Sequence, residues 1–175
     1  GPYRRITLKM GIIEKLDYLH ELGVTDIYLS PIFESSSNHR YDTGDYMKID
    51  GLLGSEEDFE ELIKRADEKG MGIILDGVFN HTGADSIYFN KFGHYDSVGA
   101  YQSKSSPYYD WYTFYDYPDD YNCWWGCTVV PTVARDAKDF HEFIAGENGV
   151  IKKWTDKGVK GWRLDVVDEL SETFV

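Results

Sequence analysis

Apolar residues recur along this chain at two spacings that alternate. In residues 12–22, 59–66 and 140–154 they return every three or four positions, which is typical of amphipathic helices. Each segment is followed by a glycine at which a helix can end: Gly23, Gly70 and Gly158. Short apolar runs follow at residues 27–31, 73–76 and 161–165. The pattern predicts helix–strand units and therefore a parallel sheet flanked by helices.

Two further signals refine this prediction. Ile6, Leu8 and Met10 alternate with polar residues, which predicts a short first strand. Ser55 and Asp58 have the spacing of a capping box at the start of the second helix. About four βα units result, whereas a complete eight-fold barrel needs roughly 250 residues. We therefore expect an α/β fold, a partial TIM (β/α)8 barrel containing about the first four units.

The alternation stops for roughly 60 residues between His81 and Asp139, far longer than an ordinary connection between a strand and a helix. More than half of the chain's Tyr, Trp and Phe residues lie there, which argues against a disordered loop. We expect three parts: residues 1–80 form the first part of the barrel, residues 81–138 an inserted aromatic-rich subdomain, and residues 139–175 the barrel continuation through the fourth strand.

Net charge, apolar runs and cysteine content restrict the possible partners and the cellular compartment. The formal net charge of −13 disfavours nucleic acids and anionic membranes. No apolar run is long enough for a membrane span, and no signal peptide is visible, although the chain begins with Gly1-Pro2 and a native leader could have been removed. Cys123 and Cys127 favour reduced thiols in a cytoplasmic protein; secretion with a local disulfide is the alternative.

Candidate chemistry gathers at the predicted strand ends. Arg163 and Asp165 lie two residues apart, so on a strand both point to the same side and the arginine would keep the carboxylate ionised. Asp76 ends another strand, with Asn80 and His81 just beyond it. In α/β folds of this type, functional side chains collect at the carboxyl ends of the strands. Taken singly, each aspartate could instead cap the following loop, and His81 could be a surface residue.

Three motifs together resemble the α-amylase family, glycoside hydrolase family 13, and within it the neopullulanase, cyclomaltodextrinase and maltogenic amylase branch. Asp76–His81 matches the family pattern D-x-x-x-N-H on the third strand, and residues 161–169 contain the pattern G-x-R-x-D of the fourth. The segment from Tyr28 through His39 to Tyr46 is similar to the loop that follows the second strand in that branch. The resemblance extends over nearly everything from Gly11 to Val175.

This resemblance implies a retaining hydrolase of α-1,4 or α-1,6 glucosidic bonds in maltodextrins, cyclodextrins, pullulan or starch. Asp165 would be the nucleophile and Arg163 would orient it and keep it ionised. His81 would donate a hydrogen bond to the sugar at the cleavage point, Tyr41 would stack on that sugar, and His39 would belong to the same substrate-binding loop. Asp76 would be a structural carboxylate that orders the site.

The departures from the family pattern matter as much. The family's general acid after the fifth strand, and its second aspartate after the seventh, have no counterpart in these 175 residues, so we expect this chain alone to be inactive. An open half-barrel would also self-associate. We expect that no cofactor is required. Asn80 matches a position that ligates calcium in some family members, but Asp168-Glu169 stands where many α-amylases carry Lys-His, one of which helps to bind calcium.

Two other classes of function remain open at this point. The chain could be a maltooligosaccharide-binding module without chemistry, in which the aromatic insertion stacks on sugars. It could also be a metal-dependent hydrolase that uses Asp76, His81 and Asp165, although Arg163 beside Asp165 would oppose a bound cation.

Overall fold

A computed structural model describes residues 7–175, and a three-stranded parallel sheet lies at its centre. The strands are β1 (Asp26–Tyr28), β4 (Gly72–Gly77) and β7 (Gly161–Leu164), in the order β1-β4-β7. In register, Tyr28 lies beside Ile74, and Asp76 lies beside Arg163. The strand ends that carry the candidate chemistry are therefore direct neighbours.

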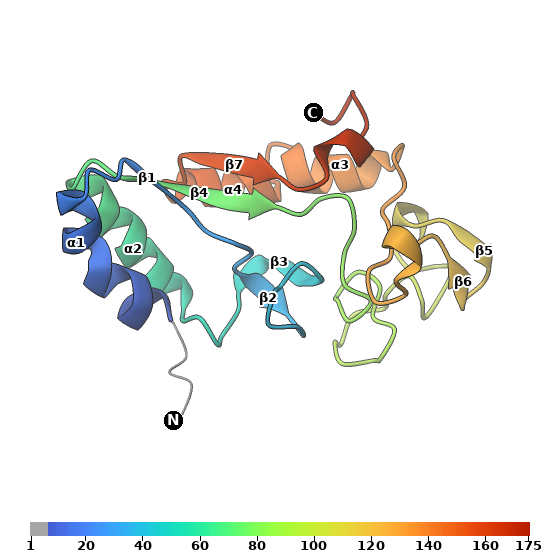
Figure 1. The fold of residues 1–175 in the computed structure, drawn as a ribbon. Helices are drawn as coiled ribbons and strands as arrows, with labels where there is room; N and C mark the ends of the chain where they lie inside the picture. Colours follow the sequence, from blue (N-terminus) through green and yellow to red (C-terminus); the bar gives the residue numbers. More distant parts are fainter. Residues whose placement is uncertain (1–6) are drawn as a thin grey trace.

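Helices connect these strands as the apolar pattern predicts. The elements are α1 (Leu16–Glu21), α2 (Glu56–Glu68), α3 (Lys138–Ala145) and α4 (Val150–Asp156). Ser55 caps α2 in a complete capping box with Asp58, and Gly23, Gly70 and Gly158 follow the helices with φ of 82°, 71° and 108°. The α/β fold and the open partial barrel are confirmed, with helix–strand units repeated along the chain (Figure 1).

The predicted first strand is wrong over its described part. Residues Leu8–Ile12 form a π-helical turn, η1, followed by the 3-10 turn η2 (Ile13–Lys15) and then α1, while Ile6 lies outside the described residues. Leu8, Ile13 and Leu16 are all buried, at the spacing of a helix face rather than of a strand. The alternation of five residues was too short to distinguish the two periods, and the described sheet contains three parallel strands instead of four.

The polar segment after β1 is a hairpin rather than a loop. Strands β2 (Phe33–Ser35) and β3 (Thr43–Ile49) pair antiparallel with irregular register. β1 itself is shorter and more exposed than the buried strand predicted at residues 27–31, with Tyr28 47% exposed, because β4 is its one neighbour in the described sheet.

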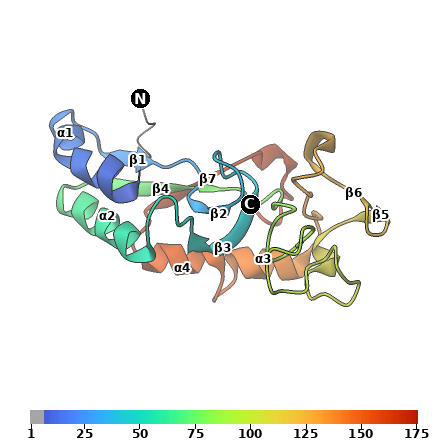
Figure 2. The same ribbon diagram turned by 90° about the horizontal axis from the view of Figure 1, so that it is seen from below.

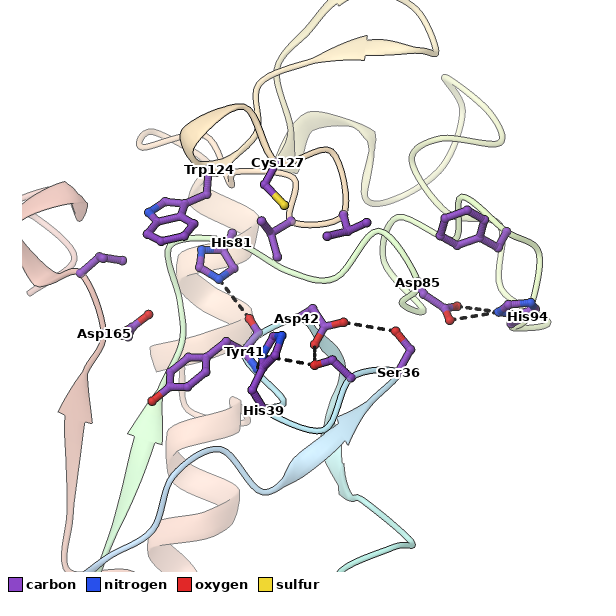
Figure 3. A pocket seen from close by; sticks show the side chains of 15 residues that line it. Ser36, His39, Tyr41, Asp42, His81, Asp85, His94, Trp124, Cys127 and Asp165 are labelled. Carbon is purple, nitrogen blue, oxygen red and sulfur yellow. Dashed lines mark hydrogen bonds and ion pairs between the residues drawn. The ribbon is translucent and has the colours of Figure 1, made fainter.

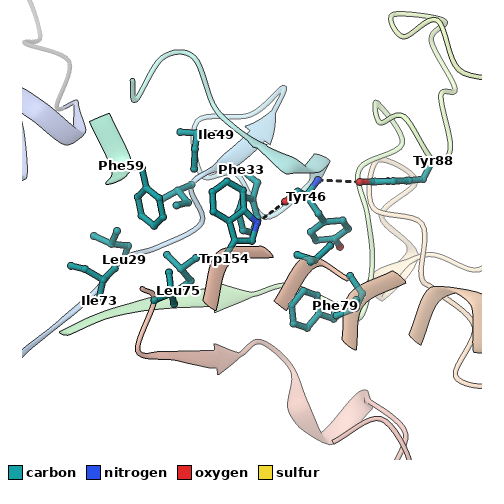
Figure 4. Packing of buried hydrophobic residues seen from close by; sticks show 14 of the residues in the cluster. Leu29, Phe33, Tyr46, Ile49, Phe59, Ile73, Leu75, Phe79, Tyr88 and Trp154 are labelled. Carbon is teal, nitrogen blue, oxygen red and sulfur yellow. Dashed lines mark hydrogen bonds between the residues drawn. The ribbon is translucent and has the colours of Figure 1, made fainter. Parts of the chain in front are cut away.

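The main core lies between the sheet, α2, α4 and the hairpin (Figure 4). Trp154 of α4 is fully buried, packs against Phe33 and Phe59 with ring centroids 5.3 and 5.6 Å away, and donates from Nε1 to the carbonyl of Tyr46 at 3.0 Å. The Tyr46 hydroxyl donates to the carbonyls of Val78 and His81, at 2.6 and 3.0 Å. The hairpin thereby holds the segment that leaves β4.

The insertion extends to the end of the molecule opposite α1 and α2 (Figures 1 and 2). Its short elements are η3 (Tyr109–Trp111), β5 (Phe114–Asp116), β6 (Asp120–Tyr121) and η4 (Trp124–Gly126), and η5 (Val167–Glu169) follows β7. Phe89 packs against Tyr112 and Tyr121 with ring centroids 5.0 and 4.7 Å away, so the insertion has packed aromatic residues of its own. The domain division at residues 81 and 138 stays a prediction. Within residues 7–175, no helix is long and apolar enough to cross a membrane.

Candidate active site

Arg163 joins two carboxylates at the ends of β4 and β7. Its Nη1 lies 3.0 Å from both oxygens of Asp76 and 2.8 Å from Oδ1 of Asp165. The Asp76 side chain is fully buried and that of Asp165 is 16% exposed. Asp76, followed by Asp165, raises the pKa of the Arg163 guanidinium. The predicted contact between Arg163 and Asp165 is therefore present, with Asp76 as the second partner.

Asp76 accepts more hydrogen bonds than the sequence indicates. Besides Arg163, the hydroxyls of Tyr28 and Tyr41 both donate to its Oδ2, the latter at 2.9 Å. Burial, followed by the bond to Asp76, raises the pKa of Tyr28, and burial is also the largest cause of the raised pKa of Tyr41. A buried carboxylate needs such partners to offset its lost hydration. Asp76 is thus held in place and has little freedom to react.

His81 is buried, and each of its two ring nitrogens has a hydrogen-bond partner. Its Nε2 lies 3.0 Å from the carbonyl oxygen of Tyr41, and its Nδ1 lies 3.2 Å from Nδ2 of Asn80. A carbonyl can only accept, so Nε2 carries the proton and Nδ1 accepts from Asn80. Burial is the largest cause of the lowered pKa of His81. The imidazole is therefore favoured in its neutral form.

These residues border a cleft of about 750 Å³ between the strand ends and the insertion (Figure 3). His39, Tyr41, His81 and Asp165 line it, and the ring of His39 stacks on Tyr41 with centroids 6.1 Å apart. Clefts of about 300–1,000 Å³ are typical of small-molecule sites. Four of the predicted site residues are thus brought together around one space, while Arg163 and Asp76 support it from the sheet.

The cleft also has residues that the sequence reasoning missed. Trp124 of η4 faces His81 with ring centroids 5.8 Å apart, and its buried Nε1 has no hydrogen-bond partner within the described residues. Asp85, Phe92 and His94 line the same cleft. These residues lie in the insertion, where apolar residues do not recur at the spacing of a helix or a strand. The sequence pattern therefore could not place them relative to the strand ends. The concentration of aromatic residues was the one available signal.

Calcium binding at Asn80 stays a prediction, and charged side chains of both signs lie near this residue. The Asn80 side chain contacts His81, and the guanidinium of Arg135 lies in the neighbouring cavity, where it donates to the carbonyls of Glu169 and Leu170, both at 3.1 Å. Asp136, Asp168 and Glu169 line the same cavity, so Arg135 opposes a bound cation there while these acidic residues attract one. Residues 7–175 contain no group of three His, Cys, Asp or Glu side chains arranged to hold a metal ion.

Comparison with known proteins adds independent information. A family model described as the catalytic domain of alpha amylase matches residues 7–137. An amylopullulanase from Thermoanaerobacterium thermosulfurigenes is 48% identical over 183 residues, covering 94% of the chain and 10% of the relative. Neopullulanase 2 from Thermoactinomyces vulgaris is 35% identical over 170 residues, covering 94% of the chain and 28% of the relative.

Solved structures agree with these matches. The cyclic alpha-maltosyl-(1→6)-maltose hydrolase of Arthrobacter globiformis, in complex with maltose, superposes with a TM-score of 0.84 at 33% identity. The match covers 96% of this chain and 37% of that one. The chain therefore spans about a tenth to just over a quarter of the length of the two curated relatives named above.

Proposed function

The chain belongs to the α-amylase family, as its motifs predicted, and from this premise we propose that it forms the nucleophile-bearing part of a retaining α-glucan hydrolase. The observation that carries the proposal is the placement of Asp165, held by Arg163, at the wall of a cleft that Tyr41 and His81 also line. The family match ends at residue 137, before Arg163, so the role of Asp165 rests on the resemblance of its motif to the fourth-strand pattern of the family, and this geometry supports it.

In the proposed reaction, a carboxylate oxygen of Asp165 attacks C1 of a glucosyl residue. The bond from C1 to the leaving oxygen breaks, a general acid protonates that oxygen, and water later hydrolyses the glycosyl-enzyme ester. Arg163 orients the Asp165 carboxylate through the 2.8 Å contact, and Asp76 fixes Arg163 from behind. Asp76 is a positioning residue, because its oxygens are already occupied by Arg163, Tyr28 and Tyr41.

Tyr41, His39 and His81 are proposed to bind the sugar at the cleavage point. The ring of Tyr41 offers a flat apolar face for stacking, and the ring of His39 lies beside it at the cleft, with an angle of 28° between the ring planes. In the structure, the N–H of His81 donates to the backbone carbonyl of Tyr41. This hydrogen bond fixes the backbone of Tyr41, the residue proposed to stack on the sugar. To bind the sugar directly, His81 would have to donate to a sugar hydroxyl in place of this carbonyl.

The general acid must lie about 5–5.5 Å from the nucleophile in a retaining enzyme. The other carboxylates that line the cleft in residues 7–175 are Asp42, which accepts hydrogen bonds from Ser35, Ser36 and Ser37, and Asp85, which is bonded to His94. Neither is free to protonate a leaving oxygen. We therefore propose that other residues of the whole enzyme supply the acid and that the isolated chain is inactive.

The substrates proposed for the whole protein are α-1,4-linked glucans, with α-1,6 bonds as a further target. Names of the relatives support this choice, since they include amylopullulanase and neopullulanase. Without the acid, the isolated chain would act as a maltooligosaccharide-binding module, an alternative that the aromatic lining of the cleft favours. A metal-dependent hydrolase is not favoured, because both ring nitrogens of His81 are engaged and Arg163 lies against both carboxylates.

Hydrolysis of maltoheptaose by the full-length protein tests the proposal. Asp165→Asn should lower kcat by about 10⁴-fold or more, because the nucleophile is lost. Asp168→Asn, an exposed position three residues further on, is the control and should leave kcat unchanged. Retention of kcat within tenfold in Asp165→Asn would overturn the proposal. Hydrolysis by the purified 175-residue chain, abolished by Asp165→Asn, would contradict the proposed inactivity of that chain.

A further inference from the structure

Phe92, His94 and Asp85 form a second group of polar and aromatic side chains in the cleft. They lie at the end of the cleft opposite Asp165, where Figure 3 shows His94 beside Asp85 and far from the imidazole of His81. Phe92 and His94 are 53% and 66% exposed, and their rings stack with centroids 6.0 Å apart. No motif of the sequence pointed to this group.

The loop that carries Phe92 and His94 is fixed by its own hydrogen bonds. Asn90 is fully buried with φ of 52°, and its Nδ2 donates to the carbonyls of Tyr95 and Ser97, both at 2.8 Å. The Tyr95 hydroxyl donates to Oε2 of Glu34 in β2 at 3.1 Å, which ties the loop to the hairpin. Gly93 adopts φ of 69°, a conformation that favours glycine and turns the chain between the two rings. The two exposed rings are therefore presented by an ordered loop.

The hydrogen bonds of His94 leave polar atoms available to a ligand. Nδ1 of His94 lies 3.0 Å from both oxygens of Asp85, so this nitrogen donates and the carboxylate accepts. Nε2 of His94 has no partner within residues 7–175, and the Asp85 oxygens retain further lone pairs. The group thus combines an exposed aromatic face with one unpartnered ring nitrogen and a partly exposed carboxylate that is 17% accessible.

We propose that Phe92, His94 and Asp85 form a distal subsite that binds a glucosyl residue of a longer α-glucan chain. The apolar face of a sugar ring stacks on Phe92, while its hydroxyls donate to Asp85 and bond to Nε2 of His94. The same cleft of about 750 Å³ is lined by these three residues and by Asp165. A glucan chain bound at Asp165 can therefore extend along the cleft to this group. The inference rests on the proposed function, and it assigns to this cleft a preference for longer substrates.

The chain-length dependence of hydrolysis by the full-length protein tests the subsite. Phe92→Ala should lower kcat/KM for maltoheptaose by about twofold to tenfold, the worth of one aromatic contact, and leave kcat/KM for maltotriose unchanged. The proposal requires that maltotriose occupies the Asp165 end of the cleft without contacting Phe92. Phe92→Tyr keeps the aromatic face and should retain the value of the unmodified protein for both substrates.

Tyr115→Ala is the matched control, because Tyr115 is an aromatic residue of the insertion that is 67% exposed and does not line the cleft. It should leave both substrates unaffected. An equal effect of Phe92→Ala on the two substrates, or none on maltoheptaose, would overturn the subsite while leaving the proposed function intact. If the unmodified protein hydrolyses neither substrate, the proposed function fails and the subsite fails with it.

Discussion

Arg163 is the residue on which the arrangement of the site depends most. It contacts Asp76 and Asp165 with the same nitrogen, and the neighbouring strands place Asp76 directly beside it. A lysine would supply one charge on a flexible stem, whereas the planar guanidinium holds its nitrogen in a fixed orientation. The spacing of Arg163 and Asp165 in the sequence predicted one of these contacts, whereas the contact with Asp76 needed the sheet register.

Burial of His81 makes the stability of the chain depend on pH. Burial lowers the pKa of His81 in the folded chain below its ordinary value, which is about 6.5 in an unfolded chain. As the pH falls below about 6.5, the unfolded state binds the proton first, so the free energy of unfolding decreases until the folded-state pKa is passed. We predict that the melting temperature falls between pH 7.5 and pH 5.5, and that His81→Gln reduces this fall.

The matched control is His20→Gln, because His20 is exposed on α1. Thermal unfolding of the full-length protein, followed by circular dichroism at the two pH values, measures the effect. His20→Gln should keep the full pH dependence of the unmodified chain. An identical pH dependence in His81→Gln would show that His81 does not carry it.

At the scale of elements, the sequence correctly predicted the helix starts and ends that depend on a few consecutive residues. Ser55 and Asp58 form their capping box, and the glycines after α1, α2 and α4 adopt positive φ, because these features depend on a few consecutive residues. The hairpin of β2 and β3 was missed because the segment between its strands is polar and the strands pair in an irregular register. The π-helical turn at Leu8–Ile12 was missed because its burial depends on α2 and on the segment near Leu53.

The open sheet leads to a prediction about association. In the described sheet, β1 and β7 each pair with β4 alone, Tyr28 of β1 is 47% exposed, and Leu22 at the end of α1 is 61% exposed. Unpaired strand edges and exposed apolar surface favour contact with another chain. We predict that the isolated 175-residue chain self-associates, with a mass in light scattering that rises with concentration. A single-chain mass at every concentration, with cooperative melting, would contradict this prediction.

At the scale of the whole molecule, the site is formed by parts that are far apart in the sequence. Tyr28 and Asp76 are 48 residues apart, and His81 meets the backbone of Tyr41 across 40 residues. The strand-end rule brought Asp76 and Asp165 together correctly, since it depends on the fold class alone. It could not give Tyr28, Trp124 or Phe92, because their positions depend on the path of the hairpin and of the insertion.

The most direct test of the central claim is to trap the intermediate on Asp165 in the full-length protein. A fluorinated glucosyl fluoride releases fluoride without help from a general acid, so the ester between the nucleophile and C1 forms but is hydrolysed slowly. Mass spectrometry of the digested protein should find one added fluoroglucosyl group on the peptide that contains Asp165, and none in Asp165→Asn. Attachment to any other carboxylate would contradict the assignment of Asp165 as the nucleophile.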